Sequence, residues 1–398
     1  MNLILFDEPE IRQNLLPFTF TRPVADIRVG ILTLAEKWAH VAKQPVSFLT
    51  ERYLQAKFPA NTTQANIYVN GAVFPDTFLA AEIAALTPGE ALMREGRLVA
   101  LHAGSEFFGS SQHVYDHVPT TRRELPEPHV VLQNVWEIFA FNGAQIRADF
   151  KMITHGRKSQ PVNDRHTFVY GEENIFIEEG VKIRAAVLNA ESGPIYLGKN
   201  SEIQEGSLIK GPFALCEGST VNMGAKMRGD NTVGPHCKVG GEISNSVIFA
   251  HSNKGHDGFL GNSVIGEWCN LGADTNTSNL KNNYADVKLW NHAKGGFKNT
   301  GLQFCGLMMG DHSKCGINTM FNTGTVTGVS ANIFGSGFPR NFIPSFAWGG
   351  ASGFETYQLR KVFEVAEKVM ARRNKAFDQV EKDILTHVFE ETAASRNF

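Results

Sequence analysis

The sequence predicts an α/β domain followed by a left-handed parallel β-helix of hexapeptide repeats, which ends in a helical tail. Three observations support this fold class. Short apolar runs alternate with helical stretches at the start, an aliphatic residue then returns at every sixth position, and helical spacing resumes at the end. We place the three parts at residues 1–150, 165–350 and 351–398, because 398 residues are too many for one ordinary core.

The first part shows the alternation typical of an α/β domain. Its expected strands are Leu3–Phe6, Val46–Leu49 and Ile67–Val69, and its expected helices are Ile31–Ala42 and Asp76–Leu86. The segment EALMREGRLVAL predicts a hairpin that turns at Glu95-Gly96, and Asn134 to Met152 is expected to form a helical connector.

A six-residue beat identifies the second part. The aliphatic positions are Leu197, Ile203, Ile209, Leu215, Val221, Met227, Val233 and Val239, and the same spacing continues at Ile265 and Leu271 and then at Met309, Cys315, Phe321, Thr327 and Ile333. Six residues make one side of a triangular coil, so the aliphatic side chains should stack inside, and the small residues four positions later should fit the corners. The alternative is an ordinary sheet domain whose aliphatic residues fall at this spacing by accident. Eight aliphatic residues in a row at intervals of six argue against it. Coils of this kind expose flat walls, which favours association side by side, and by analogy with this fold class we expect a homotrimer.

The tail is predicted to be helical from Ser352–Glu355, which fits a capping box. Apolar residues then recur at helical spacing at Leu359, Val362, Phe363, Ala366 and Met370. We expect this amphipathic segment to brace the β-helix of its own assembly.

Composition excludes several classes of protein. With 38 basic and 40 acidic residues and no block of one sign, nucleic-acid binding is not expected. No apolar stretch is long enough for a membrane span, and the start of the chain lacks a secretory signal. Five cysteines without CxxC spacing read as reduced core residues, so a cytoplasmic protein is expected.

Two interruptions of the beat, at 240–263 and 274–308, are expected to be loops that leave the coil and carry the function. The first contains His256 and Phe259-Leu-Gly-Asn262, and Ile265-Gly266, Asn270-Leu-Gly-Ala273, Thr275 and Asn279 follow. In order and spacing these residues resemble the acetyltransferase half of the bifunctional GlmU family, which makes UDP-N-acetylglucosamine.

The resemblance implies an acetyl-CoA-dependent N-acetyltransferase that acts on glucosamine-1-phosphate or a related amino-sugar phosphate or nucleotide. His256 would be the general base, because a neutral imidazole is available at pH 7 whereas a lysine amine is protonated. By the same resemblance Asn270 and Asn279 would contact the acceptor, Ala273 would meet acetyl-CoA through its backbone, and Arg228 would bind the sugar's phosphate.

Two positions depart from the family pattern. Phe259, in the substrate-binding motif, stands where the family has tyrosine, and Ser244 stands where some members have lysine. Both departures concern the identity of the acceptor. Each residue also has an alternative interpretation without a function. His256 could be a solvated or structural loop histidine, Asn270 and Asn279 could be asparagine-ladder or turn positions, and Arg228 could form a surface ion pair.

The first domain resembles the start of sugar-1-phosphate nucleotidyltransferases at Leu16–Pro23. Val24 stands where the catalytic lysine is expected, and Ala72 stands where a magnesium-binding aspartate is expected. Arg22 and Arg28 are candidates for holding a nucleotide or phosphate. We therefore expect a reduced nucleotidyltransferase-like domain, which would need Mg²⁺ only if it is active.

Two further hypotheses compete with acetyl transfer. One is a non-catalytic scaffold that uses the coils as a rigid rod. The other is a β-helical metalloenzyme of the carbonic anhydrase type, because His251 and His256 have a suitable spacing. Zinc catalysis requires three protein ligands, and the nearest third histidine, His236, is only one coil away, so no metal site is expected.

Overall fold

The computed structural model describes residues 2–105, 111–116, 118–126 and 128–398. The chain divides into two compact units, Met1–Ile27 with Leu32–Asn134, and Arg28–Ile31 with Val135–Phe398. The helical connector is therefore part of the second unit. None of the helices in the described ranges has the length and apolar character that a membrane span requires.

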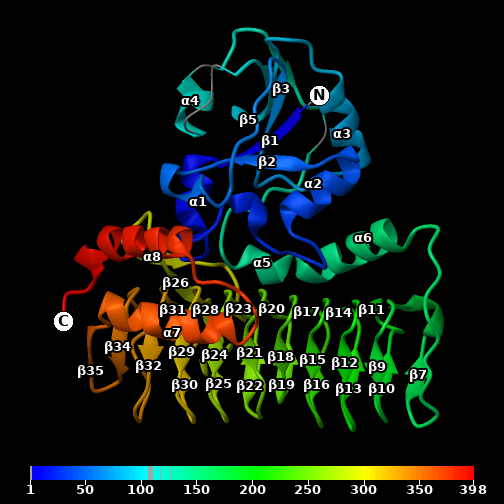
Figure 1. Cartoon of the computed structure of the whole chain (residues 1–398), viewed down its shortest axis with the longest axis vertical. Helices are drawn as coiled ribbons and strands as arrows, with labels where there is room; N and C mark the ends of the chain where they lie inside the picture. Colours follow the sequence, from blue (N-terminus) through cyan, green and yellow to red (C-terminus); the bar gives the residue numbers. More distant parts are fainter. Residues whose placement is uncertain (1, 106–110, 117, 127) are drawn as a thin grey trace. The chain divides into compact units, whose positions relative to one another are not determined.

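The first unit contains a mixed six-stranded sheet with the order β2-β1-β3-β5-β4-β6 (Figure 1). Its strands are β1 (Asn2–Phe6), β2 (Val46–Leu49), β3 (Asn66–Asn70), β4 (Ala91–Arg94), β5 (Arg97–Ala103) and β6 (Arg122–Glu124). Its α-helices are α1 (Pro9–Asn14), α2 (Leu34–Ala42), α3 (Thr77–Ala84) and α4 (Ser111–Asp116), with short 3₁₀ turns at Phe18–Phe20, Val24–Asp26 and Arg52–Leu54. The strands and helices expected in this part are confirmed.

Local sequence explains two of these boundaries. The β4–β5 hairpin turns at Glu95 and Gly96 with φ angles of 50° and 77°, which fits the primed turn that antiparallel strands prefer. Helix α2 begins with a capping box, in which Thr33 and Glu36 each bond the other's backbone N–H.

The second unit is a parallel β-helix with three walls, and successive coils add parallel strands to these walls (Figure 1). One wall is the six-stranded sheet β22-β19-β16-β13-β10-β7, which we call sheet A. The nine-stranded sheet B has the order β33-β31-β28-β23-β20-β17-β14-β11-β8, and the ten-stranded sheet C has the order β35-β34-β32-β29-β24-β21-β18-β15-β12-β9.

The strand bounds follow the coils along the chain. Sheet A contains β7 (Phe168–Tyr170), β10 (Val187–Asn189), β13 (Leu208–Lys210), β16 (Lys226–Met227), β19 (Glu242–Ser244) and β22 (Phe259–Gly261). Sheet B contains β8 (Ile175–Ile177), β11 (Ile195–Leu197), β14 (Phe213–Leu215), β17 (Asn231–Val233), β20 (Val247–Ile248), β23 (Val264–Ile265), β28 (Met308–Met309), β31 (Val326–Thr327) and β33 (Phe342–Ile343). Sheet C contains β9 (Lys182–Ile183), β12 (Glu202–Ile203), β15 (Thr220–Val221), β18 (Lys238–Val239), β21 (Asn253–Lys254), β24 (Asn270–Leu271), β29 (Lys314–Cys315), β32 (Asn332–Ile333), β34 (Ala347–Gly350) and β35 (Gly353–Thr356).

The hexad prediction is confirmed by the register of the strands. Leu197 pairs with Leu215, and Leu215 pairs with Val233, so every third hexad residue stacks on the same wall. These three side chains are fully buried in one continuous core, and the small corner residues Ser207 and Ser219 are fully buried as well. All five cysteines are buried free thiols, as expected.

The first interruption was predicted wrongly. Residues 240–263 do not leave the coil, because they form β19 to β22 in register with their neighbours. The coils shorten instead: Val233 pairs with Ile248, fifteen positions later, where an undisturbed coil has eighteen. The second interruption does leave the coil after β25 (Asn276–Thr277), and it contains the antiparallel pair β26 (Lys288–Asn291) and β27 (Gly296–Asn299) before β28; β25 itself pairs with β30 (Met320–Phe321).

Helices cover parts of the β-helix. The expected connector is α5 (Glu137–Ala140) and α6 (Asn142–Thr154), and the tail is α7 (Leu359–Ala371) and α8 (Gln379–Glu391) (Figure 1). The predicted capping box at Ser352–Glu355 is wrong, because this segment forms β35 and pairs with β34. Gly353 has a φ of 137°, which glycine adopts readily, and the helix begins only after Gln358. Short 3₁₀ turns lie at Glu172–Asn174 and Ala393–Ser395.

Candidate functional site

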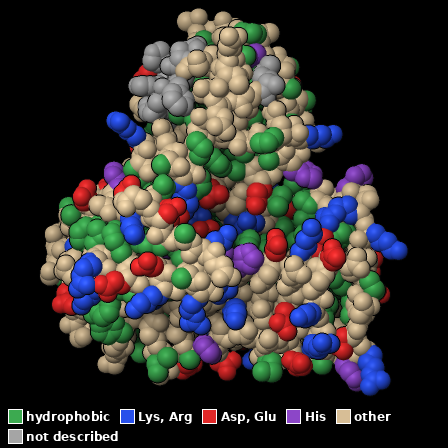
Figure 2. Space-filling view, viewed as in Figure 1, with side chains coloured by type: hydrophobic (Ala, Val, Ile, Leu, Met, Phe, Trp, Pro, Cys, Tyr) green, Lys and Arg blue, Asp and Glu red, His purple; other side chains and the backbone are tan. Residues whose placement is uncertain are grey.

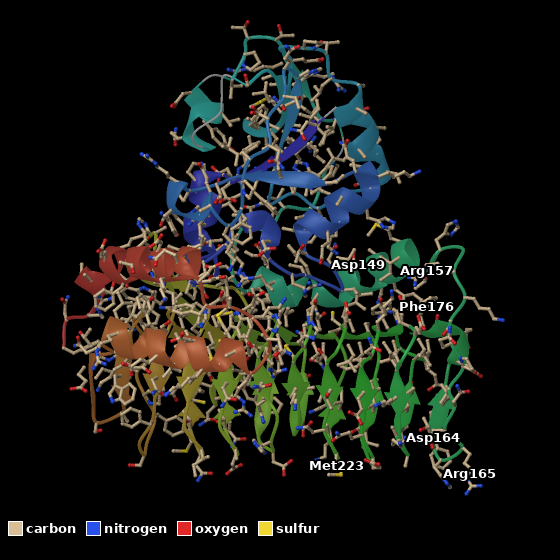
Figure 3. All side chains as sticks on the ribbon, viewed as in Figure 1. Asp149, Arg157, Asp164, Arg165, Phe176 and Met223 are labelled. Carbon is tan, nitrogen blue, oxygen red and sulfur yellow. The ribbon has the colours of Figure 1, made fainter. Side chains whose placement is uncertain are left out.

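His256 lies at the corner where the chain passes from sheet C to sheet A, between β21 and β22. His256 and residues at the same corner of the neighbouring coils line an open hollow of about 500 Å³. Its lining residues are Met223, Gly240, Gly241, Gly255, His256, Asp257, Ala273 and Asp274. Figure 3 shows Met223 at the edge of the β-helix. The structure thus brings His256 and Ala273, two predicted site residues, into one pocket.

Glycines on the preceding coil let the loop 255–258 lie close to it. A Cβ atom on Gly240 would stand 2.6 Å from the carbonyl oxygen of Gly255. A Cβ atom on Gly241, whose φ is +72°, would stand 2.6 Å from the carbonyl oxygen of Gly258. Only glycine avoids both the contact and the strained backbone.

Hydrogen bonds hold the backbone of this loop. The Asn222 amide donates to the Gly255 carbonyl at 2.7 Å, and the Glu242 N–H donates to the Gly258 carbonyl at 3.1 Å. The carbonyl of Asp257 accepts from the Asp274 N–H at 3.1 Å. The imidazole of His256 is exposed on this anchored backbone, so a substrate can reach it.

Phe259, on the strand β22 that follows His256, lies beside Asn279, which follows β25 on the next coil. A Cβ atom on Gly261 would stand 2.6 Å from the Phe259 ring and 2.7 Å from the Asn279 amide nitrogen, so both side chains close over this glycine. The Asn279 amide donates to the Asn262 side chain at 2.8 Å. These two predicted acceptor-side residues therefore share one patch at the end of sheet A.

Asn270 and Arg228 are placed elsewhere. Asn270 lies on sheet C in register with Asn253, whose amide nitrogen is 3.5 Å from the Asn270 side-chain oxygen, and this arrangement fits the asparagine-ladder alternative. Arg228 follows β16 of sheet A and makes an ion pair with Glu242 at 2.8 Å, with most of its side chain exposed. Charged side chains of both signs are interspersed over the face of the β-helix in Figure 2.

His251 and His256 do not converge on one site. His251 lies at the corner between sheets B and C, where its ring stacks between His236 at 5.1 Å and Trp268 at 4.1 Å. Burial lowers the pKa of His251 to about 4, so its ring is neutral at pH 7. Among the described residues, no group of three or more His, Cys, Asp or Glu side chains could hold a metal ion. The stacked geometry disfavours the carbonic anhydrase hypothesis.

The two arginines proposed for the first domain are buried. Arg22 is 3.4 Å from Asp26, and the guanidinium of Arg28, which belongs to the second unit, donates to the Ile31 carbonyl. Sequence reasoning missed Asp7, a buried carboxylate that accepts from Thr50 and from the Val24 N–H and contacts Arg12 at 3.4 Å. Burial raises the pKa of Asp7, and nothing in its sequence context distinguished it.

Sequence reasoning also missed Lys254. Its side chain occupies an inward position of the β-helix, in register with Val239, and is 1% exposed. The sequence contained a signal for Lys254, because the six-residue repeat predicts an apolar residue near this position. A lysine there is an exception that needs a reason.

Comparisons with known proteins agree with this architecture. Residues 3–158 match the family model described as sugar nucleotidyl transferase. The chain is 30% identical over 160 residues to a bifunctional sugar-1-phosphate nucleotidylyltransferase/acetyltransferase from Sulfurisphaera tokodaii, covering 40% of this chain and 37% of that protein. It is 31% identical over 86 residues to the bifunctional protein GlmU from Trichodesmium erythraeum, covering 21% of this chain and 18% of that protein.

The match to a solved structure of UDP-N-acetylglucosamine acyltransferase from Arabidopsis covers 58% of this chain and 93% of that chain, at 15% identity and with a TM-score of 0.23. The chain spans well under two thirds of the length of the two curated relatives. By these matches residues 3–158 are similar to the sugar nucleotidyl transferase family, and the chain is similar, at modest identity, to GlmU-type bifunctional nucleotidyltransferase/acetyltransferases.

Proposed function

We propose that this chain is an acetyl-CoA-dependent N-acetyltransferase that acts on glucosamine-1-phosphate or a related amino-sugar phosphate or nucleotide. The observation that carries the proposal is the position of His256, exposed at an open, glycine-walled pocket that it shares with Ala273. The similarity to a bifunctional nucleotidylyltransferase/acetyltransferase supports this reaction class.

His256 would act as the general base. The amine of the acceptor forms a bond to the thioester carbonyl carbon, and His256 takes the proton that the amine loses. When the tetrahedral intermediate collapses, the carbon–sulfur bond breaks and the thiolate of coenzyme A leaves. Backbone N–H groups at the corner would stabilise the oxyanion, with the backbone near Ala273 next to the acyl donor.

The remaining predicted residues would bind the acceptor. Phe259 on β22 and Asn279 from the segment after β25 form one patch over Gly261, which supports a joint role in holding the sugar. Arg228 on the same sheet would meet the phosphate by exchanging its exposed ion pair with Glu242 for a phosphate group. Asn270 would contact the acceptor only from a neighbouring copy, because it lies on another wall.

The protein would be cytoplasmic, and association into a homotrimer would complete the site. Met223 lies at a corner between sheets C and A, and Ile317 lies at the corner between β29 of sheet C and β30; they are 71% and 69% exposed. Exposed apolar side chains on the corner that carries His256 support contact with a second copy. The oligomeric state can be measured by light scattering, and a monomer at micromolar concentration would contradict this part of the proposal.

The direct test is to incubate the full chain with acetyl-CoA and glucosamine-1-phosphate and to follow N-acetylglucosamine-1-phosphate by mass spectrometry. His256→Ala should lower kcat at least about a hundredfold. His155→Ala is a matched control, because His155 is also exposed but caps α6. Undiminished product with His256→Ala would remove the assignment of the base, and absence of product with amino-sugar acceptors would favour the scaffold hypothesis.

The match to the sugar nucleotidyl transferase model favours a second activity in the first unit. The residues do not fit the magnesium site expected from the resemblance, however, because Ala72 is fully buried where the metal-binding aspartate is expected and a methyl side chain cannot bind a cation. We therefore derive no nucleotidyl transfer step. Formation of a sugar nucleotide from UTP and N-acetylglucosamine-1-phosphate with Mg²⁺ would show that the unit is active by another arrangement.

A further inference from the structure

A lysine lies inside the β-helix directly beneath the His256 corner. Lys254 pairs in register with Val239, a fully buried hexad residue, and its own side chain is 1% exposed. Aliphatic side chains fill the other inward positions nearby, including Ile243 and Leu260. Burying a charged amine among them costs free energy unless hydrogen bonds compensate.

The amine of Lys254 is directed at two adjacent carbonyls of the corner loop. It donates to the carbonyl oxygen of Asp257 at 2.9 Å and to that of His256 at a short distance. Burial lowers the pKa of Lys254 to about 8. With the bonds from Asn222 to Gly255 and from Glu242 to Gly258, every carbonyl from 255 to 258 has a donor.

We propose that Lys254 is a positioning residue, which holds the carbonyls of His256 and Asp257 from inside the core and so fixes the direction of the His256 imidazole. This inference rests on the proposed function of His256. A backbone anchor from below leaves the imidazole free for proton transfer, while the loop cannot move away from the acceptor. Misplacing a catalytic group by about 1 Å can cost about a hundredfold in rate.

Lys254→Met is the informative variant. Methionine is unbranched and flexible, so it can fill the lysine's channel without a charge and without donors to the carbonyls. Lys314→Met is the matched control, because Lys314 also donates to two backbone carbonyls, those of His312 and Trp268, but at a different corner of the β-helix.

Two readouts are taken on the full chain. In the acetyl transfer assay, Lys254→Met should lower kcat at least about tenfold while the KM for acetyl-CoA changes less than about threefold, and Lys314→Met should leave both unchanged. In hydrogen exchange, a peptide that spans 255–262 should exchange at least about tenfold faster in Lys254→Met, with the other coils unchanged.

The outcomes separate the two proposals. If the unsubstituted chain transfers no acetyl group, the proposed function fails, whereas the exchange measurement still decides whether Lys254 holds the loop. Unchanged exchange at 255–262 in Lys254→Met overturns the proposal for Lys254. Faster exchange with an unchanged kcat also overturns it, because the anchor would then have no effect on the base.

Discussion

Replacing Lys254 by methionine should change how the stability of the β-helix depends on pH. Burial lowers the pKa of Lys254 from its usual 10.5 to about 8, because the interior disfavours the ammonium form. Below pH 8 the folded and unfolded chains both hold the proton, so the full cost of the buried charge is present. Between pH 8 and 10.5 the folded chain has released a proton that the unfolded chain keeps, and stability rises with pH.

The size of the effect follows from the shift. One pKa unit corresponds to about 1.4 kcal/mol, so lowering the pKa to about 8 corresponds to roughly 3 kcal/mol of the free energy of unfolding. For a unit of this size, 1 kcal/mol moves the Tm by roughly 2–4 °C. The Tm of the unsubstituted chain should therefore rise by roughly 6–12 °C relative to Lys254→Met between pH 7 and pH 10.5.

The assay is thermal unfolding of both proteins, followed by circular dichroism at intervals across this range. Groups that titrate equally in the two proteins cancel in the difference, so the difference reports Lys254. A Tm difference that stays constant from pH 7 to pH 10.5 would refute the reasoning. It would mean that the lysine keeps its ordinary pKa in the folded chain, as an amine accessible to water does.

Three further predictions follow from other parts of the β-helix. Met227→Ala removes a fully buried hexad side chain and should cost about 2–5 kcal/mol in denaturant unfolding, so a loss under about 1 kcal/mol would contradict tight packing. His251→Phe keeps the ring stack but removes a group whose pKa is about 4 when folded; the unsubstituted chain should lose Tm relative to this variant as the pH falls from 6.5 to 4, and parallel Tm curves would contradict this. Gly241→Ala would place a Cβ atom 2.9 Å from the His256 carbonyl and should lower kcat about tenfold or more, whereas Gly224→Ala, with nothing within 4 Å and a similar φ, controls for backbone strain; equal activity of both variants would contradict a steric role.

For much of the candidate site, the sequence predicted which residues belong to it but not how they are arranged in space. The motif placed His256, Ala273, Phe259 and Asn279 close in sequence, and the structure brings them together in two pairs, one at the corner and one at the end of sheet A. Asn270 belongs to the same motif but lies on another wall. The reason is geometric: successive hexads of one coil face three different directions, so nearness in sequence does not give nearness in space.

Sequence by itself determined the repeat architecture and the elements with strong local signals. The hexad beat predicted which side chains stack inside, and the Glu95-Gly96 turn predicted a hairpin, because both depend on short-range patterns that leave few alternatives. Only the tertiary structure decided the rest. It showed that residues 240–263 stay in the coil, since the register between coils can be kept with fifteen positions instead of eighteen when the corners shorten. It placed Gly353–Thr356 in a strand, because pairing with β34 outweighs a local capping preference. It also turned Lys254 inward, where two carbonyls of the next corner compensate a charge that no local pattern would place in the core.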